Sequence, residues 1–189
     1  MKLRRLAIAS TLALVGFALS GCTVNINTND GHHMMGGNNS SFSNTDVMFA
    51  QMMIPHHQQA VDMGTLAGTH ASNAAVKALA AQIGDEQAPE IAQMKGWLKD
   101  AGAGMEMGYD MSMGGMLSDS EFEALKTATG AAFDKLYLQG MIGHHEGAIQ
   151  MAKMVLNSKN AEVKALGEAI VASQTKQITY MKELLTKLG

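Results

Sequence analysis

The sequence is poor in cysteine and in aromatic residues. Its single cysteine, Cys22, has no partner for an intrachain disulfide and cannot form a thiolate zinc or redox centre alone. Aromatic residues make up 5% of the chain, so the core must consist largely of Ala, Leu and Met, which favours helices over sheets. Any sulfur chemistry must come from the 17 methionines, an excess that needs an explanation.

Positive charge is also scarce. Once residues 1–21 are removed, 11 basic residues stand against 17 acidic ones, and the net charge is −6. Nucleic-acid binding depends on clustered Lys and Arg that contact phosphates. We therefore expect no nucleic-acid partner.

The N-terminus lacks an apolar run long enough to span a bilayer, which takes about 20 residues. Residues 6–19 are apolar, follow three basic residues and lead into Leu-Ser-Gly-Cys at positions 19–22. This pattern predicts a lipoprotein signal peptide over residues 1–21, with lipidation of Cys22. We therefore expect an exported protein, anchored to a membrane on its extracytoplasmic side, periplasmic or at the cell surface. An ordinary secretory signal with a chance cysteine is the alternative.

Residues 22–45 are rich in Asn, Ser, Thr and Gly and show no periodicity, which predicts a flexible tether. Within it, residues 32–35 read His-His-Met-Met. Metal capture and chance both remain open for this short motif.

From residue 46 onward the chain shows helical periodicity and an internal repeat. Residues 46–63 match residues 134–151 at an offset of 88, and after a one-residue gap the match resumes at 76 and 163. One helical hairpin cannot cover its own apolar face, whereas two can close a bundle. The sequence therefore predicts an all-α four-helix bundle over residues 46–189, built from two duplicated hairpins.

Within this domain we expect helices over about 46–70, 73–100, 131–157 and 161–188, with a short helix opening at Ser118. The connection over residues 101–130 is long. It leaves open whether the first helices of the two copies run parallel or antiparallel, and so whether the two copies share one site or form two.

Each copy carries two adjacent histidines on its first helix, flanked by methionines. A methionine three residues before the inward histidine can reach both rings of its pair. Imidazole accepts Cu(II) or Cu(I), and thioether prefers soft ions such as Cu(I). The sequence therefore predicts a copper site, with Ag(I) as a further candidate. The predicted ligands are His56, His57, His144, His145, Met53, Met141, Met63 and Met151.

The Gly-rich connection over residues 101–117 supplies more thioethers, which could wrap round a soft cation or serve only as adaptable packing. These predicted secondary ligands are Met105, Met107, Met111, Met113 and Met116.

Two polar positions also repeat. Gln87 and Gln174 lie on otherwise apolar stripes, where each needs a partner: a histidine ring nitrogen, or the backbone of a neighbouring helix. Asp46 and Asp134 lie far from the histidines along their helices, so we expect a helix cap from Asp46 and a polar contact at the bundle end from Asp134.

The repeated motif resembles the bacterial family named domain of unknown function 305. Met53-Ile54-Pro55-His56-His57 with Ala60 matches its hallmark, and the second copy matches through Met141-Ile142-Gly143-His144-His145 with Ala148. The resemblance covers nearly all of residues 46–188. It implies a ferritin-like four-helix bundle, and some relatives are exported copper-binding proteins linked to copper tolerance.

We expect a non-catalytic protein that buffers copper or exchanges it with donor or acceptor proteins. A di-metal oxidase on the same bundle would need a Glu three residues before a ligand His, and no His here has one. A structural or partner-binding lipoprotein, in which the histidines only pack, is the other alternative.

Overall fold

The computed structural model describes residues 41–106 and 113–188, and this part of the chain is helical without strands. The elements are α1 (Asn44–His70), α2 (Ala74–Asp100), α3 (Asp119–Thr127), α4 (Gly130–Ala152), the 3-10 helix η1 (Lys153–Val155) and α5 (Ala161–Leu188). Across these ranges, no helix is both long and apolar enough to cross a membrane. The predicted signal peptide, Cys22, most of the tether and residues 32–35 lie outside the described residues.

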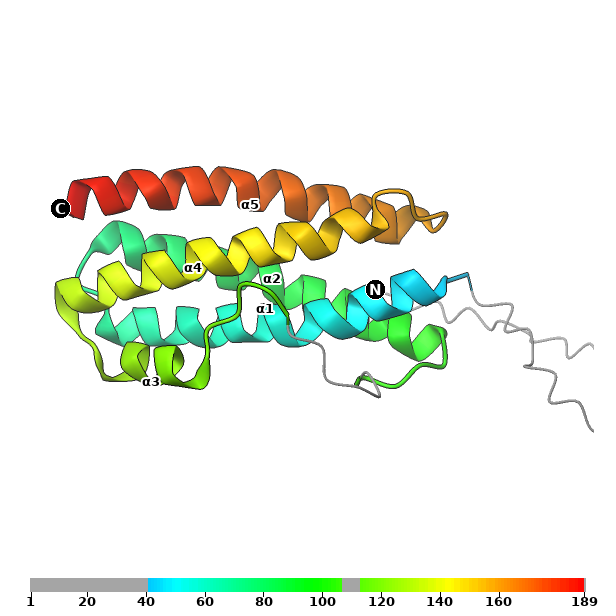
Figure 1. The fold of residues 1–189 in the computed structure, drawn as a ribbon, viewed down its shortest axis with the longest axis horizontal. Coiled ribbons are helices and arrows are strands. Elements are labelled where there is room, and N and C mark those ends of the chain that lie inside the picture. The colour runs from blue at the N-terminus through cyan, green and yellow to red at the C-terminus, as the bar shows by residue number, and fades with distance from the viewer. Residues whose placement is uncertain (1–40, 107–112, 189) are drawn as a thin grey trace, which may run out of the picture. The chain divides into compact units, whose positions relative to one another are not determined.

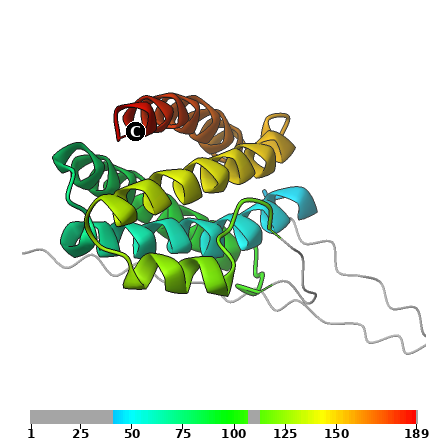
Figure 2. The same cartoon turned by 60° about the vertical axis from the view of Figure 1, so that its left-hand side comes forward.

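The four long helices form a bundle of two antiparallel hairpins, α1–α2 and α4–α5, which confirms the predicted fold class (Figure 1). The hairpins meet mainly through α1 and α4, which run in opposite directions in both views (Figures 1 and 2). Asp134, near the start of α4, accepts hydrogen bonds from Ser72 and Asn73, just beyond the end of α1. The first helices of the two copies, α1 and α4, are therefore antiparallel, which the sequence of the long connection left open.

Local sequence signals set the helix starts. Ser43 and Asp46 form a capping box, and α1 begins at Asn44, two residues before the predicted domain boundary. Ser118 and Glu121 form a second capping box at α3, as the sequence predicted. The expected cap from Asp46 and the expected bundle-end contact of Asp134 are both present.

The helix predicted over residues 131–157 is shorter than expected. α4 ends at Ala152, and the chain tightens into η1 before turning into α5. A Cβ added at Gly167 of α5 would lie 2.8 Å from Val155 and 3.1 Å from the Ala152 carbonyl oxygen. The absence of a side chain at Gly167 lets this tight turn pack against α5, a tertiary contact that α4's own sequence does not reveal.

The core consists of two apolar clusters. One contains Met53 of α1 and Met151 of α4, and the other contains Met63 of α1 and Met141 of α4. The histidine pair of each helix lies between its two methionines in sequence. Because α1 and α4 are antiparallel, the histidines form a polar layer between the two clusters.

Candidate metal centre

The two histidine pairs meet in the middle of the bundle. His56, His57, His144 and His145 are all completely buried. The rings of His56 and His144 lie against each other, with centroids 3.8 Å apart and planes tilted by 40°. The centroids of His144 and His145 are 6.2 Å apart. The two copies therefore place their histidine pairs side by side in one layer of the bundle.

The inward histidines are held by backbone carbonyls. Nε2 of His144 lies 2.8 Å from the carbonyl oxygen of His56 on the facing helix. Nε2 of His56 lies 3.2 Å from the carbonyl oxygen of Gly114, in the connection between the hairpins. A carbonyl oxygen only accepts, so each Nε2 carries the proton and donates.

The flanking histidines are held by side chains of the second helix of each hairpin. Nε2 of His57 lies 2.8 Å from a carboxylate oxygen of Glu90 on α2. Nε2 of His145 lies 2.8 Å from Oε1 of Gln177 on α5. Gln177 in turn donates from its Nε2 to Glu86 at 2.8 Å, which orients its oxygen towards His145. These two rings also donate from Nε2.

The other nitrogen of each ring is Nδ1. Each Nδ1 is buried and has no hydrogen-bond partner within the described residues. With the proton on Nε2, Nδ1 of a neutral ring carries a lone pair, the form in which imidazole ligates metals. An unsatisfied buried acceptor costs about 1–3 kcal/mol, so four in one layer are a substantial local cost unless a ligand uses them.

Burial keeps three of the rings uncharged. It lowers the pKa of His56 from 6.5 to about 3, aided by repulsion from His57 and opposed by the hydrogen bond to Gly114. Burial also lowers the pKa of His145 to about 4, although its bond to Gln177 opposes the shift. The pKa of His144 is lowered by burial and by repulsion from His56 and His145. Neutral imidazoles are ready to bind a metal without first losing a proton.

The layer does not supply a complete set of nitrogen and oxygen ligands. Within residues 41–106 and 113–188, no three His, Asp or Glu side chains are grouped so that they could hold one metal ion. Two imidazoles bound to one ion at about 2 Å have ring centroids roughly 5–6 Å apart, farther apart than the centroids of His56 and His144. In this arrangement an ion would need other ligands in addition to a histidine.

The predicted methionine ligands adjoin this layer along α1 and α4. Met53, Met63 and Met141 are fully buried and Met151 is nearly so. Met53 and Met141 each precede their histidine pair by one helical turn. Their role as ligands remains a prediction.

The methionines of the connection are less uniform. Met105 is 45% exposed, whereas Met113 is partly buried and packs against the cluster that contains Met53. Met116 is half-buried. Met107 and Met111 lie outside the described residues.

The return segment, residues 113–117, crosses α4 directly beside the histidines. A Cβ at Gly147 of α4 would overlap the Gly114 carbonyl oxygen, and one at Gly115 would overlap the carbonyl of Gly143. Gly115 also has a φ of +87°, a conformation that other residues rarely adopt. Glycine on both sides therefore allows the backbone contact that places the Gly114 carbonyl on His56.

A glutamine of α1 fixes the end of this segment. Gln59 bonds the backbone of Leu117 twice, donating to its oxygen at 3.0 Å and accepting from its nitrogen at 2.8 Å. The return segment is thus tied to both α1 and α4.

The predicted hydrogen bonds from Gln87 and Gln174 to the histidines are not present. Both glutamines are buried, but across the described ranges neither bonds a ring nitrogen, and Gln87 leaves both amide atoms without a partner. Glu90 and Gln177 take that role instead. Each lies three residues further along the same helix, on the face that meets the flanking histidine.

A signal for these residues exists in the repeat. Glu90 and Gln177 occupy matched positions at the offset of 87 that holds for the second helices. Because the two residues differ, a search for identical residues passes over them.

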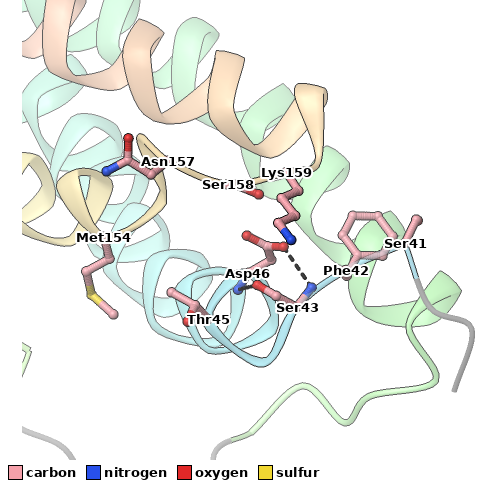
Figure 3. A pocket seen from close by; sticks show the side chains of 9 residues that line it. All are labelled: Ser41, Phe42, Ser43, Thr45, Asp46, Met154, Asn157, Ser158 and Lys159. Carbon is pink, nitrogen blue, oxygen red and sulfur yellow. Dashed lines mark hydrogen bonds between the residues drawn. The ribbon is translucent and has the colours of Figure 1, made fainter. Parts of the chain in front are cut away.

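A surface hollow of 490 Å³ lies at the N-terminal end of α1, and none of the four histidines lines it. Figure 3 shows Asp46, Lys159 and Met154 around it. Asp46 is 3% exposed and keeps one carboxylate oxygen without a partner, whereas the matching Asp134 has both oxygens bonded. The two ends of the duplicated bundle are therefore not equivalent.

The profile of the family "Domain of unknown function (DUF305)" matches residues 46–185. The chain belongs to the DUF305 family. A DUF305 protein from Streptomyces coelicolor, described as a candidate secreted protein, has a solved structure that matches with a TM-score of 0.73 and 33% identity. That match covers 77% of this chain and 94% of the other.

Structures of CopM also match. The Cu(I)-bound form has a TM-score of 0.65 and 32% identity, covering 77% of this chain and 98% of CopM. CopM has also been solved in Cu(II)-bound and Ag-bound forms, which match similarly. The uncharacterized protein L153 of Acanthamoeba polyphaga mimivirus is 43% identical over 53 residues, which is 28% of this chain and only 35% of that protein.

Proposed function

We propose that this DUF305 protein is a non-catalytic, extracytoplasmic copper-binding protein that contributes to copper buffering or tolerance. The observation that carries the proposal is the layer of four buried imidazoles whose Nδ1 atoms have no partner among the described residues. Thioethers flank the layer on both helices, and imidazole with thioether is a ligand set that suits Cu(I), Cu(II) and Ag(I).

The relatives support the choice of metal and of compartment. CopM, about one-third identical over most of its length, has been solved with Cu(I), Cu(II) and silver. The Streptomyces coelicolor relative is described as a candidate secreted protein. We further propose attachment to a membrane through a lipid on Cys22, which mass spectrometry of the membrane-bound protein would detect as a lipid-modified N-terminus. Exchange with copper donor or acceptor proteins belongs to the same proposal.

The test is a metal titration of residues 41–189. We expect Cu(I) and Cu(II) to bind more tightly than micromolar, and Zn(II) to bind more weakly because thioether is a poor ligand for it. Copper binding weaker than micromolar in both oxidation states would contradict the proposal.

A second readout locates the ion. Cu(I) is diamagnetic, so long-range ¹H–¹⁵N NMR can follow the Nδ1 resonances of the buried histidines during the titration. We expect those resonances to shift, while those of His70, a partly exposed histidine at the end of α1, stay unchanged. Shifts confined to His70 would place the metal elsewhere.

A further inference from the structure

The two histidine pairs differ in one charged group. We call His56 and His57 the first pair, and His144 and His145 the second pair. In the first pair, Nε2 of His57 donates to the Glu90 carboxylate, and in the second, Nε2 of His145 donates to the Gln177 amide oxygen, each at 2.8 Å. The duplication has kept the hydrogen bond and changed the charge of its acceptor.

The surroundings give this difference weight. His57 and His145 are completely buried, and the side chain of Glu90 is 19% exposed. A charge beside a buried ring is screened less than one in open water. Glu86 also lies in the second pair's network, but it contacts Gln177 and not the imidazole. Only the first pair has a carboxylate directly on a ring in the part of the chain that the structure describes.

We infer that Glu90 makes the first pair the one that favours Cu(II), while Gln177 leaves the second pair suited to Cu(I) or Ag(I). This inference rests on the proposed function. A carboxylate that accepts the Nε2 proton makes the imidazole a stronger donor through Nδ1 and places a negative charge near the ion. Both effects stabilise a dication more than a monocation, because the Coulomb energy scales with the ion's charge.

Glu90 is a positioning residue in this scheme, since it contacts His57 and not the ion. Its mechanical role and its electrostatic role can be separated. Glu90→Gln keeps an acceptor of the same shape and removes the charge, which makes the first pair resemble the second. Gln177→Glu performs the reverse exchange.

The experiment measures Cu(II) and Cu(I) affinities of the 41–189 domain by competition with chelators of known affinity. We expect Glu90→Gln to weaken Cu(II) binding at the first pair by about 10- to 100-fold, with a much smaller change for Cu(I). Gln177→Glu should strengthen Cu(II) binding at the second pair. Glu168→Gln, at an exposed position of α5, is the matched control and should change neither affinity.

Spectroscopy adds a readout that a purely structural role would not move. With one equivalent of Cu(II), we expect the electron paramagnetic resonance spectrum to change in Glu90→Gln and to return towards the original in Glu90→Asp, which restores the charge. Folding of each variant is checked by helical circular dichroism before metal is added.

The outcomes separate the two proposals. If the unmodified domain binds no copper, the proposed function fails. If it binds copper and Glu90→Gln leaves the ratio of Cu(II) to Cu(I) affinity unchanged, this inference is overturned while the proposed function stands.

Discussion

At the scale of single residues, the histidine layer combines full burial with a hydrogen bond at Nε2 of each ring. Burial alone would make each imidazole a costly polar group, and the bond at Nε2 recovers only one of its two nitrogens. The same burial lowers the pKa of His56, His144 and His145, so these rings stay neutral on folding. Burial therefore both keeps these rings in the neutral form that binds metals and makes the stability of the domain depend on pH.

The lowered pKa values predict acid sensitivity of the metal-free domain. Below pH 6.5 the histidines of the unfolded chain bind protons, whereas folded His56 stays neutral down to about pH 3 and folded His145 down to about pH 4. Protonation therefore favours unfolding. The contribution of these neutral rings to stability is fully present above pH 6.5. At lower pH, we expect the free energy of unfolding to fall by up to about 1.4 kcal/mol per pH unit for each such histidine. Urea unfolding at pH 7.5, 6 and 5 measures this. Equal stability at pH 7.5 and 5 would contradict it.

The sequence was informative about which rings meet, but not about what holds them. The repeat and its spacing placed His56 and His144 on inner faces, and in the structure their rings lie against each other. The partners of the flanking rings depend on how the second helix of each hairpin is rotated, which a stripe of identical residues does not determine. Gln87 and Gln174 follow that stripe, whereas the bonds go to Glu90 and Gln177.

At the scale of elements, the return segment connects the Met-rich connection to the histidines. Its backbone approaches α4 closely only because Gly147 has no side chain, and its Gly114 carbonyl sets the orientation of His56. No sequence motif marks the residues that make this contact. Predicting it would also have required the direction of α4 relative to α1. The sequence of the long connection predicts neither the contact nor that direction.

Gly147→Ala tests that contact. The new methyl group would overlap the Gly114 carbonyl, so the return segment must move and the bond to His56 must break. We expect a net loss of about 1–3 kcal/mol of stability, typical of overpacking, together with faster proteolysis within the connection. Chemical denaturation and limited proteolysis provide the measurements.

Gly143→Ala is the matched control for this variant. It lies one turn away on the same helix, and a Cβ there would meet nothing within 4 Å. The exchange should be neutral or stabilise by up to about 1 kcal/mol, because alanine favours helix. Equal destabilisation by the two variants would show that the contact with the return segment is not the cause.

At the scale of the whole molecule, each apolar cluster contains methionines from both hairpins, and the histidine layer contains histidines from both. The fold class and the duplication followed from the sequence, since the repeat covers both hairpins. The antiparallel approach of α1 and α4 did not follow, because no pattern in the sequence of residues 101–130 predicts the path of the chain. That approach is what brings the two pairs together.

The shared core predicts the behaviour of half the molecule. Residues 41–103 alone, with α1 and α2, would expose the face that α4 covers. We expect this hairpin to fold only by pairing with a second copy, so that its helicity depends on concentration and its mass in sedimentation is that of a dimer. A cooperatively folded monomer would contradict this prediction.

The bond from His144 to the main-chain oxygen of His56 has a consequence for how such a site can change over generations. A main-chain atom survives side-chain replacement, so a variant that loses the imidazole at position 56 keeps the oxygen on which the opposite ring depends. The ring at position 56 relies in the same way on the main-chain oxygen of Gly114, which a replacement at position 144 leaves in place. Either inward histidine can thus be replaced without removing the hydrogen-bond acceptor of the other, so the two copies can diverge at these positions one at a time.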